Sequence, residues 1–299
     1  MDVVRLRAFR EFAERGTVTA AAAALHCTPS AVSQQIRSLA ADLGVELTEP
    51  AGRGLRLTDA GRVLHDRADA VLAAADLLEA ELDRYRAAPR GRVRVTLFPS
   101  GALMLLVPLL AAVGDRPEFA VDCRVIDVPH AEAVGLLADF DVVVTHYDDH
   151  GVSASGPRVD AVPLLREPLD IALPPGHPLT ARSELRLVDL AAQDWISVDA
   201  GMPVDDVLTS LGTTTGVRPR IIQRINDFAV TEQLVAAGIG VALLPRYSTD
   251  WSQLVRRPLV GTAAARRVEA LVRRGTADRP GIAAVLTALG TTADSLRRA

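Results

Sequence analysis

Side chains able to hydrogen-bond the edges of base pairs are concentrated in residues 28 to 37, TPSAVSQQIR. If this segment is a helix, Val32 and Ile36 fall on one face at a spacing of four, and polar side chains cover the opposite face. Gln and Arg can each form two parallel hydrogen bonds with one base. The candidate DNA-contacting residues here are Thr28, Pro29, Ser30, Ser33, Gln34 and Arg37. The segment therefore predicts recognition of double-stranded DNA.

Two short helices joined by a tight turn must present this face. Thr17 is expected to cap a helix that ends near Leu25, and Thr28 to cap a second helix with Pro29 at its first position, where the missing N–H costs nothing. The alanine run 20–24 lets the two helices approach closely, as a helix-turn-helix requires. A helical hairpin that only packs a core has the same pattern, so this alternative stays open at this point.

The residues that follow favour a winged domain. Gly44 is expected to end the second helix, and residues 45–57 alternate apolar and polar side chains around a Gly-Arg-Gly turn, as a β-hairpin would. Arg53 and Arg56 could contact phosphates from this wing. Up to residue 62 there are eight arginines and seven acidic residues. Because the net charge is so small, affinity must depend on where the arginines lie and on two copies binding together.

The order of helix, helix-turn-helix, wing and the run L-T-D-A-G resembles the winged N-terminal domain of LysR-type transcriptional regulators. The positions that agree with the family pattern are Phe9, Ala21, Ala22, Leu25, Ala31, Val32, Ser33, Ile36, Leu39, Leu43, Gly44, Leu47, Leu57, Thr58 and Gly61. Three positions depart from it, with Ala40 in place of Glu, Thr48 in place of Phe and Pro50 in place of Arg. The last two are expected to loosen the wing and to remove one cation that contacts the DNA backbone.

The resemblance covers the whole chain and implies a multi-domain protein. An all-α-rich winged helix-turn-helix N-terminal domain and a long linker helix precede a C-terminal α/β two-lobed periplasmic-binding-protein-like effector domain. The expected division is a DNA-binding domain at 1–58, a coiled-coil linker helix at 59–87, a hinge at 88–91 and an effector-binding domain at 92–299. Lobe I is expected at 92–161 and 263–299, and lobe II at 162–262. The alternation of strand and helix patterns after residue 92 independently favours parallel strands with crossover helices.

A ligand site is expected in the cleft between the lobes, because ligands of open α/β sheets bind at the carboxyl ends of the strands. Ser100 is expected to cap the helix after strand 92–98, and a helix N-terminus attracts anions. The expected effector is therefore small, polar and anionic, although no cleft arginine is evident. The strand ends and the resemblance together select Ser100, Gly101, Thr145, His146, Asp199, Met202, Asn226 and Phe228 as candidate effector-binding residues.

The long helix carries an apolar repeat with alternating steps of four and three residues, which is typical of a coiled-coil seam. The candidate dimerisation residues are Leu64, Ala68, Val71, Ala75, Leu78 and Leu82. A monomer could pack the same stripe on its own domain, so both interpretations stay open. Two paired helix-turn-helices would meet half-sites about 34 Å apart, or a multiple of that, on an operator with dyad symmetry. The resemblance also implies tetramers and makes RNA polymerase a candidate partner.

Other functions have weak support. Apolar runs are shorter than the roughly 20 residues of a membrane span, so we expect a cytoplasmic protein with no membrane partner. Cys27 and Cys123 are too far apart in the expected domains for a structural disulfide. The segment 146–150, HYDDH, could ligate a metal, but its spacing matches no metal signature, so we expect neither metal nor cofactor. Motifs of catalysis are missing, which excludes an obvious enzyme. A ligand-independent repressor and a solute-binding protein remain as alternatives.

Overall fold

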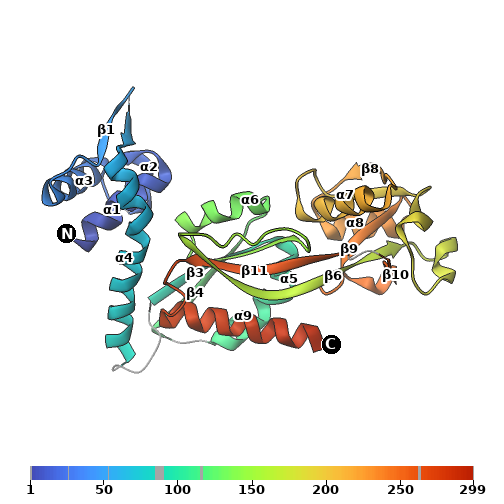
Figure 1. Cartoon of the computed structure of the whole chain (residues 1–299). Coiled ribbons are helices and arrows are strands. Elements are labelled where there is room, and N and C mark those ends of the chain that lie inside the picture. The colour runs from blue at the N-terminus through green and yellow to red at the C-terminus, as the bar shows by residue number, and fades with distance from the viewer. Residues whose placement is uncertain are drawn as a thin grey trace.

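The computed structural model describes residues 2–25, 27–52, 54–84, 91–114, 117–261 and 264–298. Its N-terminal part, the winged domain, contains α1 (Val3–Arg15), α2 (Val18–Ala24), α3 (Pro29–Leu43), the hairpin of β1 (Thr48–Ala51) and β2 (Gly54–Leu57), and the start of the long helix α4 (Asp59–Arg84) (Figure 1). This is the order of elements that the sequence predicts.

The helices of the winged domain begin and end at residues that cap them. The hydroxyls of Thr17 and Thr28 each accept a hydrogen bond from a backbone N–H three residues later, at 3.2 Å, as expected. Gly44 ends α3 in the left-handed conformation with φ 69°. The Thr58 hydroxyl accepts from the Gly61 N–H at 3.0 Å and donates to the Glu46 carbonyl at 2.7 Å, so the start of α4 is held against the wing.

Two residues of the expected dimer seam, Leu64 and Ala68, pack in the core of the winged domain instead. Ala68 is fully buried in this core and Leu64 packs against it, so Ala68 serves the chain's own domain and its assignment to a dimer contact is corrected. The cause is that the first half of α4 lies on the other helices of its own domain. Val71 and Leu78 remain 37% and 60% exposed, whereas the side chain of Leu82 lies outside the described residues. The half-buried Ala75 lies between these two positions.

Lobe I is the part of the C-terminal fold nearest the winged domain. The strand β3 (Gly91–Leu97) pairs in parallel with β4 (Phe119–Val125) and β5 (Val142–Asp148). The helices α5 (Pro99–Val113) and α9 (Pro280–Arg298) pack together on this sheet through a shared apolar core, and α6 (His130–Ala133) and the 3₁₀ turn η1 (Val134–Ala138) precede β5. The parallel strands and crossover helix agree with expectation.

Lobe II repeats this arrangement around β7 (Asp194–Ser197), which pairs in parallel with β8 (Arg220–Arg224) and β9 (Val241–Pro245). Its helices are α7 (Pro203–Thr215) and α8 (Phe228–Ala236), and β10 (Val255–Pro258) pairs with β6 (Val159–Leu173). Short 3₁₀ turns lie at η2 (Pro178–Ala181), η3 (Leu187–Leu190) and η4 (Trp251–Gln253). Trp195, only 1% exposed, is the largest side chain of the lobe II core.

Two long strands join the lobes. β6 pairs over most of its length with β11 (Ala265–Arg273) and at its carboxyl end with β9 and β10, so one continuous strand belongs to both lobes. The boundary expected at residues 161 and 162 therefore falls inside β6. The sequence patterns predict a strand only at residues 169–173 of this segment, because Pro163, Pro168 and the charged pair Arg166 and Glu167 interrupt its apolar run. They predict no helix at residues 203–215, where α7 lies.

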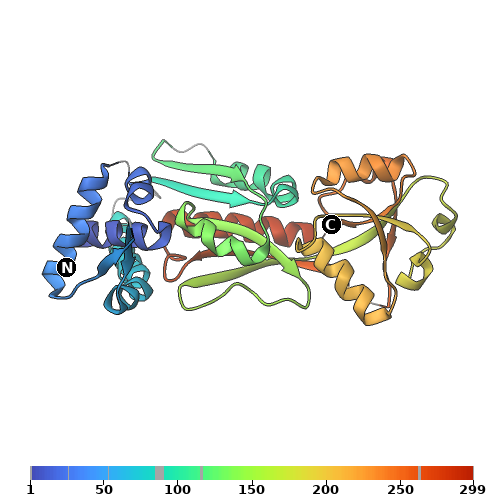
Figure 2. The ribbon, with the colours of Figure 1, turned by 90° about the horizontal axis from the view of Figure 1, so that it is seen from above.

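The winged domain rests against lobe I. Figure 2 shows the winged domain, lobe I and lobe II following one another along the molecule. Arg15 of α1 donates to the Ala138 carbonyl at 3.0 Å and to Asp139 at 2.6 Å, directly after η1. A guanidinium nitrogen of Arg158 lies 2.7 Å from Nε2 of His65 on α4. Across the described ranges, no helix is long and apolar enough to span a membrane.

Candidate DNA-binding face and effector cleft

The exposed side of α3 brings the predicted DNA-contacting residues together. Val32 and Ile36 are buried beneath it, whereas Gln34 and Arg37 are exposed on its surface. At the start of the helix the hydroxyls of Thr28 and Ser30 lie 3.0 Å apart and are also exposed. Pro29 is exposed beside them, and Ser33 is half-buried. A helix that presents an amide and a guanidinium one turn apart matches the dimensions of a DNA major groove.

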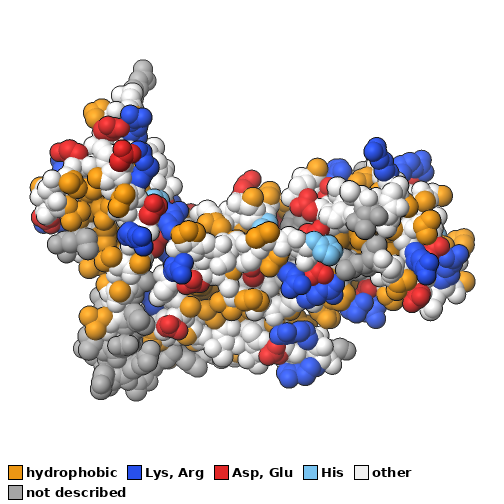
Figure 3. Space-filling model, viewed as in Figure 1, with side chains coloured by type: hydrophobic (Ala, Val, Ile, Leu, Met, Phe, Trp, Pro, Cys, Tyr) orange, Lys and Arg blue, Asp and Glu red, His pale blue; other side chains and the backbone are white. Residues whose placement is uncertain are grey.

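The wing offers less free positive charge than expected. Arg56 pairs with Glu49 across the hairpin at 2.8 Å, so a phosphate must compete with this carboxylate for the guanidinium. Arg53 lies outside the described residues. On the face shown in Figure 3, acidic and basic side chains alternate over the winged domain and around exposed hydrophobic ones. On this face of the winged domain, the basic side chains are thus interspersed with acidic ones (Figure 3).

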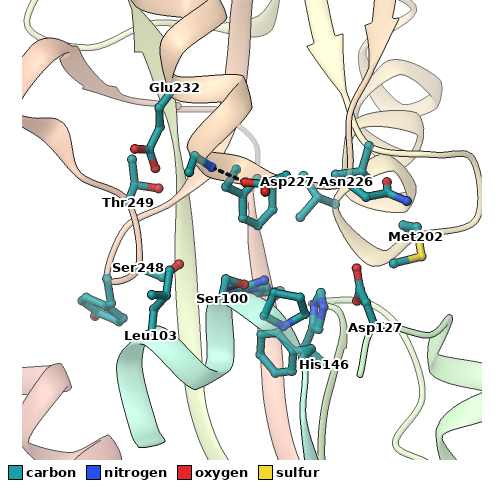
Figure 4. Close-up of a pocket in the computed structure, with 18 of the residues that line it drawn as sticks. Ser100, Leu103, Asp127, His146, Met202, Asn226, Asp227, Glu232, Ser248 and Thr249 are labelled. Carbon is teal, nitrogen blue, oxygen red and sulfur yellow. Dashed lines mark hydrogen bonds between the residues drawn. The ribbon is translucent and has the colours of Figure 1, made fainter. Parts of the chain in front are cut away.

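A cavity of about 660 Å³ lies between the lobes (Figure 4). Lobe I contributes Phe98, Pro99, Ser100, Leu103, Asp127, His146 and Arg266 to its lining, and lobe II contributes Val198, Met202, Val204, Asn226, Asp227, Phe228, Ala229, Glu232 and Gln233. The segment from Tyr247 to Asp250, which follows β9, completes the wall. A volume of this size suits a small organic molecule.

Five of the eight candidate effector-binding residues line the cavity, namely Ser100, His146, Met202, Asn226 and Phe228. Gly101, Thr145 and Asp199 are not among the residues that line it. A side chain at Gly101 would meet the ring of Phe98 at 2.7 Å. Thr145 precedes His146 on β5, and alternation along a strand turns it to the other face of the sheet. Asp199 instead accepts a hydrogen bond from the amide of Asn226 at 2.8 Å and so orients that residue.

Ser100 has a different role from the expected helix cap. The helix α5 begins at Pro99, with Phe98 at the capping position and no side-chain cap, so Ser100 lies within the first turn. Its side chain is buried, and its hydroxyl accepts a hydrogen bond from Nη2 of Arg266 at 2.9 Å. The hydroxyl is thus held by a cation at the floor of the cleft.

Arg266 is the cleft residue that the sequence analysis missed, and the expectation of a cleft without arginine is wrong. It is fully buried and pairs with the equally buried Glu167, with Nη2 at 2.6 Å from the carboxylate. Its guanidinium also lies 5.0 Å from the centre of the Phe98 ring. The sequence patterns predict a strand at residues 267–272, and Arg266 directly precedes it, so the strand itself begins earlier than its pattern indicates.

The titratable groups of the cleft are shifted by their surroundings. Burial, and then the positive charge of Arg266, lower the pKa of His146 well below its ordinary value, so this imidazole is neutral at pH 7. Burial raises the pKa of Glu232. A hydrogen bond with the backbone of Asp250 opposes this shift, whereas the negative charges of Asp250 and Asp227 add to it. Burial likewise raises the pKa of Asp127. Large pKa shifts of this kind are common in sites that bind a ligand or transfer a proton.

The segment 146–150, considered above as a metal site, is engaged in other contacts. Asp149 forms ion pairs with Arg166 at 2.7 Å and Arg267 at 3.0 Å. Asp148 accepts hydrogen bonds from the His150 N–H at 2.7 Å and from Ser210 at 3.0 Å. Within the portion of the chain that the structure describes, no group of three or more His, Cys, Asp or Glu residues is placed to hold a metal ion.

Comparisons with known proteins agree with this architecture. Residues 3–62 match the family model for the bacterial regulatory helix-turn-helix protein of the lysR family, and residues 86–294 match the LysR substrate binding domain. The chain is 30% identical over 247 residues to a probable hydrogen peroxide-inducible genes activator of Mycobacterium avium, covering 82% of this chain and 78% of that protein.

Solved structures share the whole fold. Full-length CbnR complexed with its target DNA is 26% identical, with a TM-score of 0.55 over 98% of this chain and 100% of that one. Full-length OxyR C199D from Pseudomonas aeruginosa, at 19% identity, has a TM-score of 0.69 over 97% of this chain and 98% of that one. The chain belongs to the LysR family of bacterial regulatory helix-turn-helix proteins. It is a DNA-binding transcriptional regulator with a C-terminal substrate-binding domain.

Proposed function

We propose that this regulator reads a dyad-symmetric operator through the exposed face of α3, as a dimer or tetramer. A small molecule held in the cleft between the lobes changes that binding. The observation that supports DNA reading most directly is the amphipathic division of α3, with Val32 and Ile36 buried and Gln34 and Arg37 exposed. Sequencing the genomic fragments that the purified protein retains would supply the operator for the experiments below.

Replacing Gln34 by Ala is expected to relax base preference at one position of each half-site, at a cost of about 1–3 kcal/mol for the preferred base. The amide can bond two atoms of one base, and alanine can bond neither. Footprinting and competition with operators altered base by base would measure the change.

The matched control is Arg56→Ala, because a phosphate contact carries no sequence information. This variant should weaken binding to all sequences alike and reduce the salt dependence of affinity. If the Gln34→Ala protein binds with unchanged affinity and selectivity, α3 is not the helix that recognises the bases.

Communication between the cleft and the DNA-binding part can run along β11. This strand carries Arg266 at the cleft and Arg273 at its other end, where Arg273 lies 3.8 Å from Asp141, close to the place at which Arg15 of α1 binds lobe I. A change in lobe closure would move this strand relative to β6 and hence the surface on which the winged domain rests. The expected hinge at 88–91 lies, except for Gly91, outside the described residues.

Filling the cleft with an indole tests this coupling without a known effector. Ala229 lines the cavity at the start of α8, so Ala229→Trp should shift the balance between open and closed lobes. We expect operator affinity or DNA bending to change by the equivalent of about 1–3 kcal/mol, roughly 5- to 150-fold in affinity. Gel-shift titration and a bending assay would measure both.

Val230→Trp is the control, because Val230 is 45% exposed and does not line the cavity. It should leave both quantities unchanged. If Ala229→Trp also leaves them unchanged, the cleft does not control DNA binding and the ligand-independent repressor becomes the better account.

The exposed apolar residues of α4 support self-association. Leu78 is 60% exposed on a long helix, and a second copy of this helix would cover it. We expect Leu78→Asp to reduce the mass measured by light scattering, whereas Ala70→Asp, on an exposed position of the same helix away from the seam, should not. An unchanged mass for Leu78→Asp would exclude the seam.

The peroxide response in the name of the Mycobacterium avium relative is not transferred to this chain. The two cysteines of this chain are Cys27 in the winged domain and Cys123 on β4, and neither lines the cleft. Burial raises the pKa of Cys123, which disfavours the reactive thiolate. We therefore favour an effector that binds without forming a covalent bond and is not chemically transformed.

A further inference from the structure

The cleft contains buried polar atoms that no group of the described chain satisfies. Four residues of its lining have such an atom: Nη1 of Arg266, Nδ1 of His146, Oγ of Ser248 and Oγ1 of Thr249. Arg266 is fully buried and His146 is 7% exposed. Buried polar atoms are nearly always hydrogen-bonded, so four exceptions around one cavity indicate polar groups of a ligand. On the lobe I side, the hydroxyl of Ser100 and the N-terminal turn of α5 lie beside Arg266.

The opposite wall is acidic. Asp227, Glu232 and Asp250 line the cavity from the lobe II side, and Asp127 lies beside His146 (Figure 4). None of these four carboxylates forms an ion pair with any residue that the structure describes. The single cleft arginine is already paired with Glu167. The cleft therefore carries an excess of negative charge, which disfavours a ligand that is only an anion.

Apolar side chains also line the cavity. They are Phe98 and Leu103 from lobe I and Met202 and Phe228 from lobe II. Figure 4 places Glu232 and Asp227 on one side of the gap and Ser100 and His146 on the other. A ligand that fits this arrangement has an apolar body and two polar ends of opposite character.

We propose that the cleft binds an aminocarboxylate, with its ammonium group among the carboxylates of lobe II and its carboxylate group at Ser100 and Arg266. This assignment rests on the proposed function, in which the cleft holds the effector, and it replaces the purely anionic effector that the sequence predicts. The ammonium supplies the missing counter-charge, and the carboxylate satisfies the open donor of Arg266. Burial raises the pKa of Glu232, and a cation beside this carboxylate would oppose that shift.

The test uses the full chain and three matched sets of probes. Each set contains an aminocarboxylate, the same molecule without its amine, and the same molecule without its carboxylate. The amine and the carboxylate are at opposite ends of each aminocarboxylate, as the cleft requires. The sets are 4-aminobutanoate with butanoate and propylamine, 6-aminohexanoate with hexanoate and pentylamine, and 8-aminooctanoate with octanoate and heptylamine. Calorimetry and thermal unfolding should find at least one aminocarboxylate that binds at least tenfold more tightly than both of its analogues.

Glu232→Gln should remove most of that preference by weakening the aminocarboxylate at least tenfold without weakening its carboxylate-only analogue. Glu184→Gln, at an exposed position of lobe II outside the cavity, is the matched control and should change neither. Ser100→Ala should weaken the aminocarboxylate and the carboxylate analogue alike.

Three outcomes overturn the proposal: a carboxylate-only analogue that binds as tightly as its aminocarboxylate, no measurable binding of any aminocarboxylate, or unchanged discrimination in Glu232→Gln. These outcomes concern only the ligand class. The proposal that the cleft regulates DNA binding is tested separately by Ala229→Trp, because that experiment contains no ligand. It is overturned if this variant has the operator affinity and DNA bending of the wild type.

Discussion

Replacing Glu167 by Ala is expected to lower the free energy of unfolding by about 3–5 kcal/mol. Glu167 and Arg266 are both fully buried, and the substitution leaves an uncompensated guanidinium between the lobes. Glu167 also accepts a hydrogen bond from the Tyr247 N–H at 2.9 Å, so the segment that lines the cleft loses an anchor. Urea unfolding followed by tryptophan fluorescence would measure the loss, because Trp195 is buried in lobe II.

The double variant Glu167→Leu, Arg266→Met separates charge from packing. Apolar residues of similar volume often replace a buried ion pair without loss, so the double variant should be more stable than Glu167→Ala. Its cleft would nevertheless lack the cation that holds the Ser100 hydroxyl. A loss of less than about 1 kcal/mol in Glu167→Ala would mean that water reaches the guanidinium, contrary to its complete burial here.

Gly61→Ala is expected to destabilise the winged domain by about 3 kcal/mol, the upper part of the range for overpacking, and to abolish operator binding. A Cβ atom at Gly61 would lie 2.1 Å from the carbonyl oxygen of Leu47. Because the obstacle is backbone, α4 must move away from the wing. The Thr58 contact with the Glu46 carbonyl, which holds the wing to α4, would then break. Gel-shift titration and thermal unfolding would measure the two effects.

Gly290→Ala is the control for the same chemical change. Gly290 lies within α9 and an added Cβ would meet no atom within 4 Å, so alanine there should stabilise the chain by about 0.5–1 kcal/mol. It should leave operator binding unaffected. Wild-type affinity in Gly61→Ala would mean that the wing and α4 separate without consequence for DNA recognition.

The buried Glu167 and Arg266 pair also bears on how the regulator responds. β6 carries Glu167 and continues into lobe II, whereas β11 carries Arg266 and reaches the surface under the winged domain. A ligand that bonds Arg266 therefore acts on the strand pair shared by both lobes. The same pair that stabilises the fold is thus placed to respond to the occupancy of the cleft.

Local features of this protein follow from short stretches of its sequence. Thr28 and Pro29 begin α3, Gly44 ends it, and the spacing of Val32 and Ile36 selects its buried face. These rules act within one or two helical turns, so they do not depend on the remainder of the chain. The strand ends that carry Ser100, His146 and Asn226 could be predicted to meet at one cleft for a different reason, because ligands of open α/β sheets bind at the carboxyl ends of the strands.

Tertiary structure alone decided which distant residues complete each site. Arg266 reaches Ser100 across 166 positions of sequence, and Glu167 joins it from the middle of a strand whose prolines conceal its pattern. Ala68 has the same apolar character whether it faces a second chain or its own domain, and only the packing of α4 assigns it to the core. Sequence periodicity identifies which faces are buried, but the partner that buries each face is set by contacts between residues far apart in the chain.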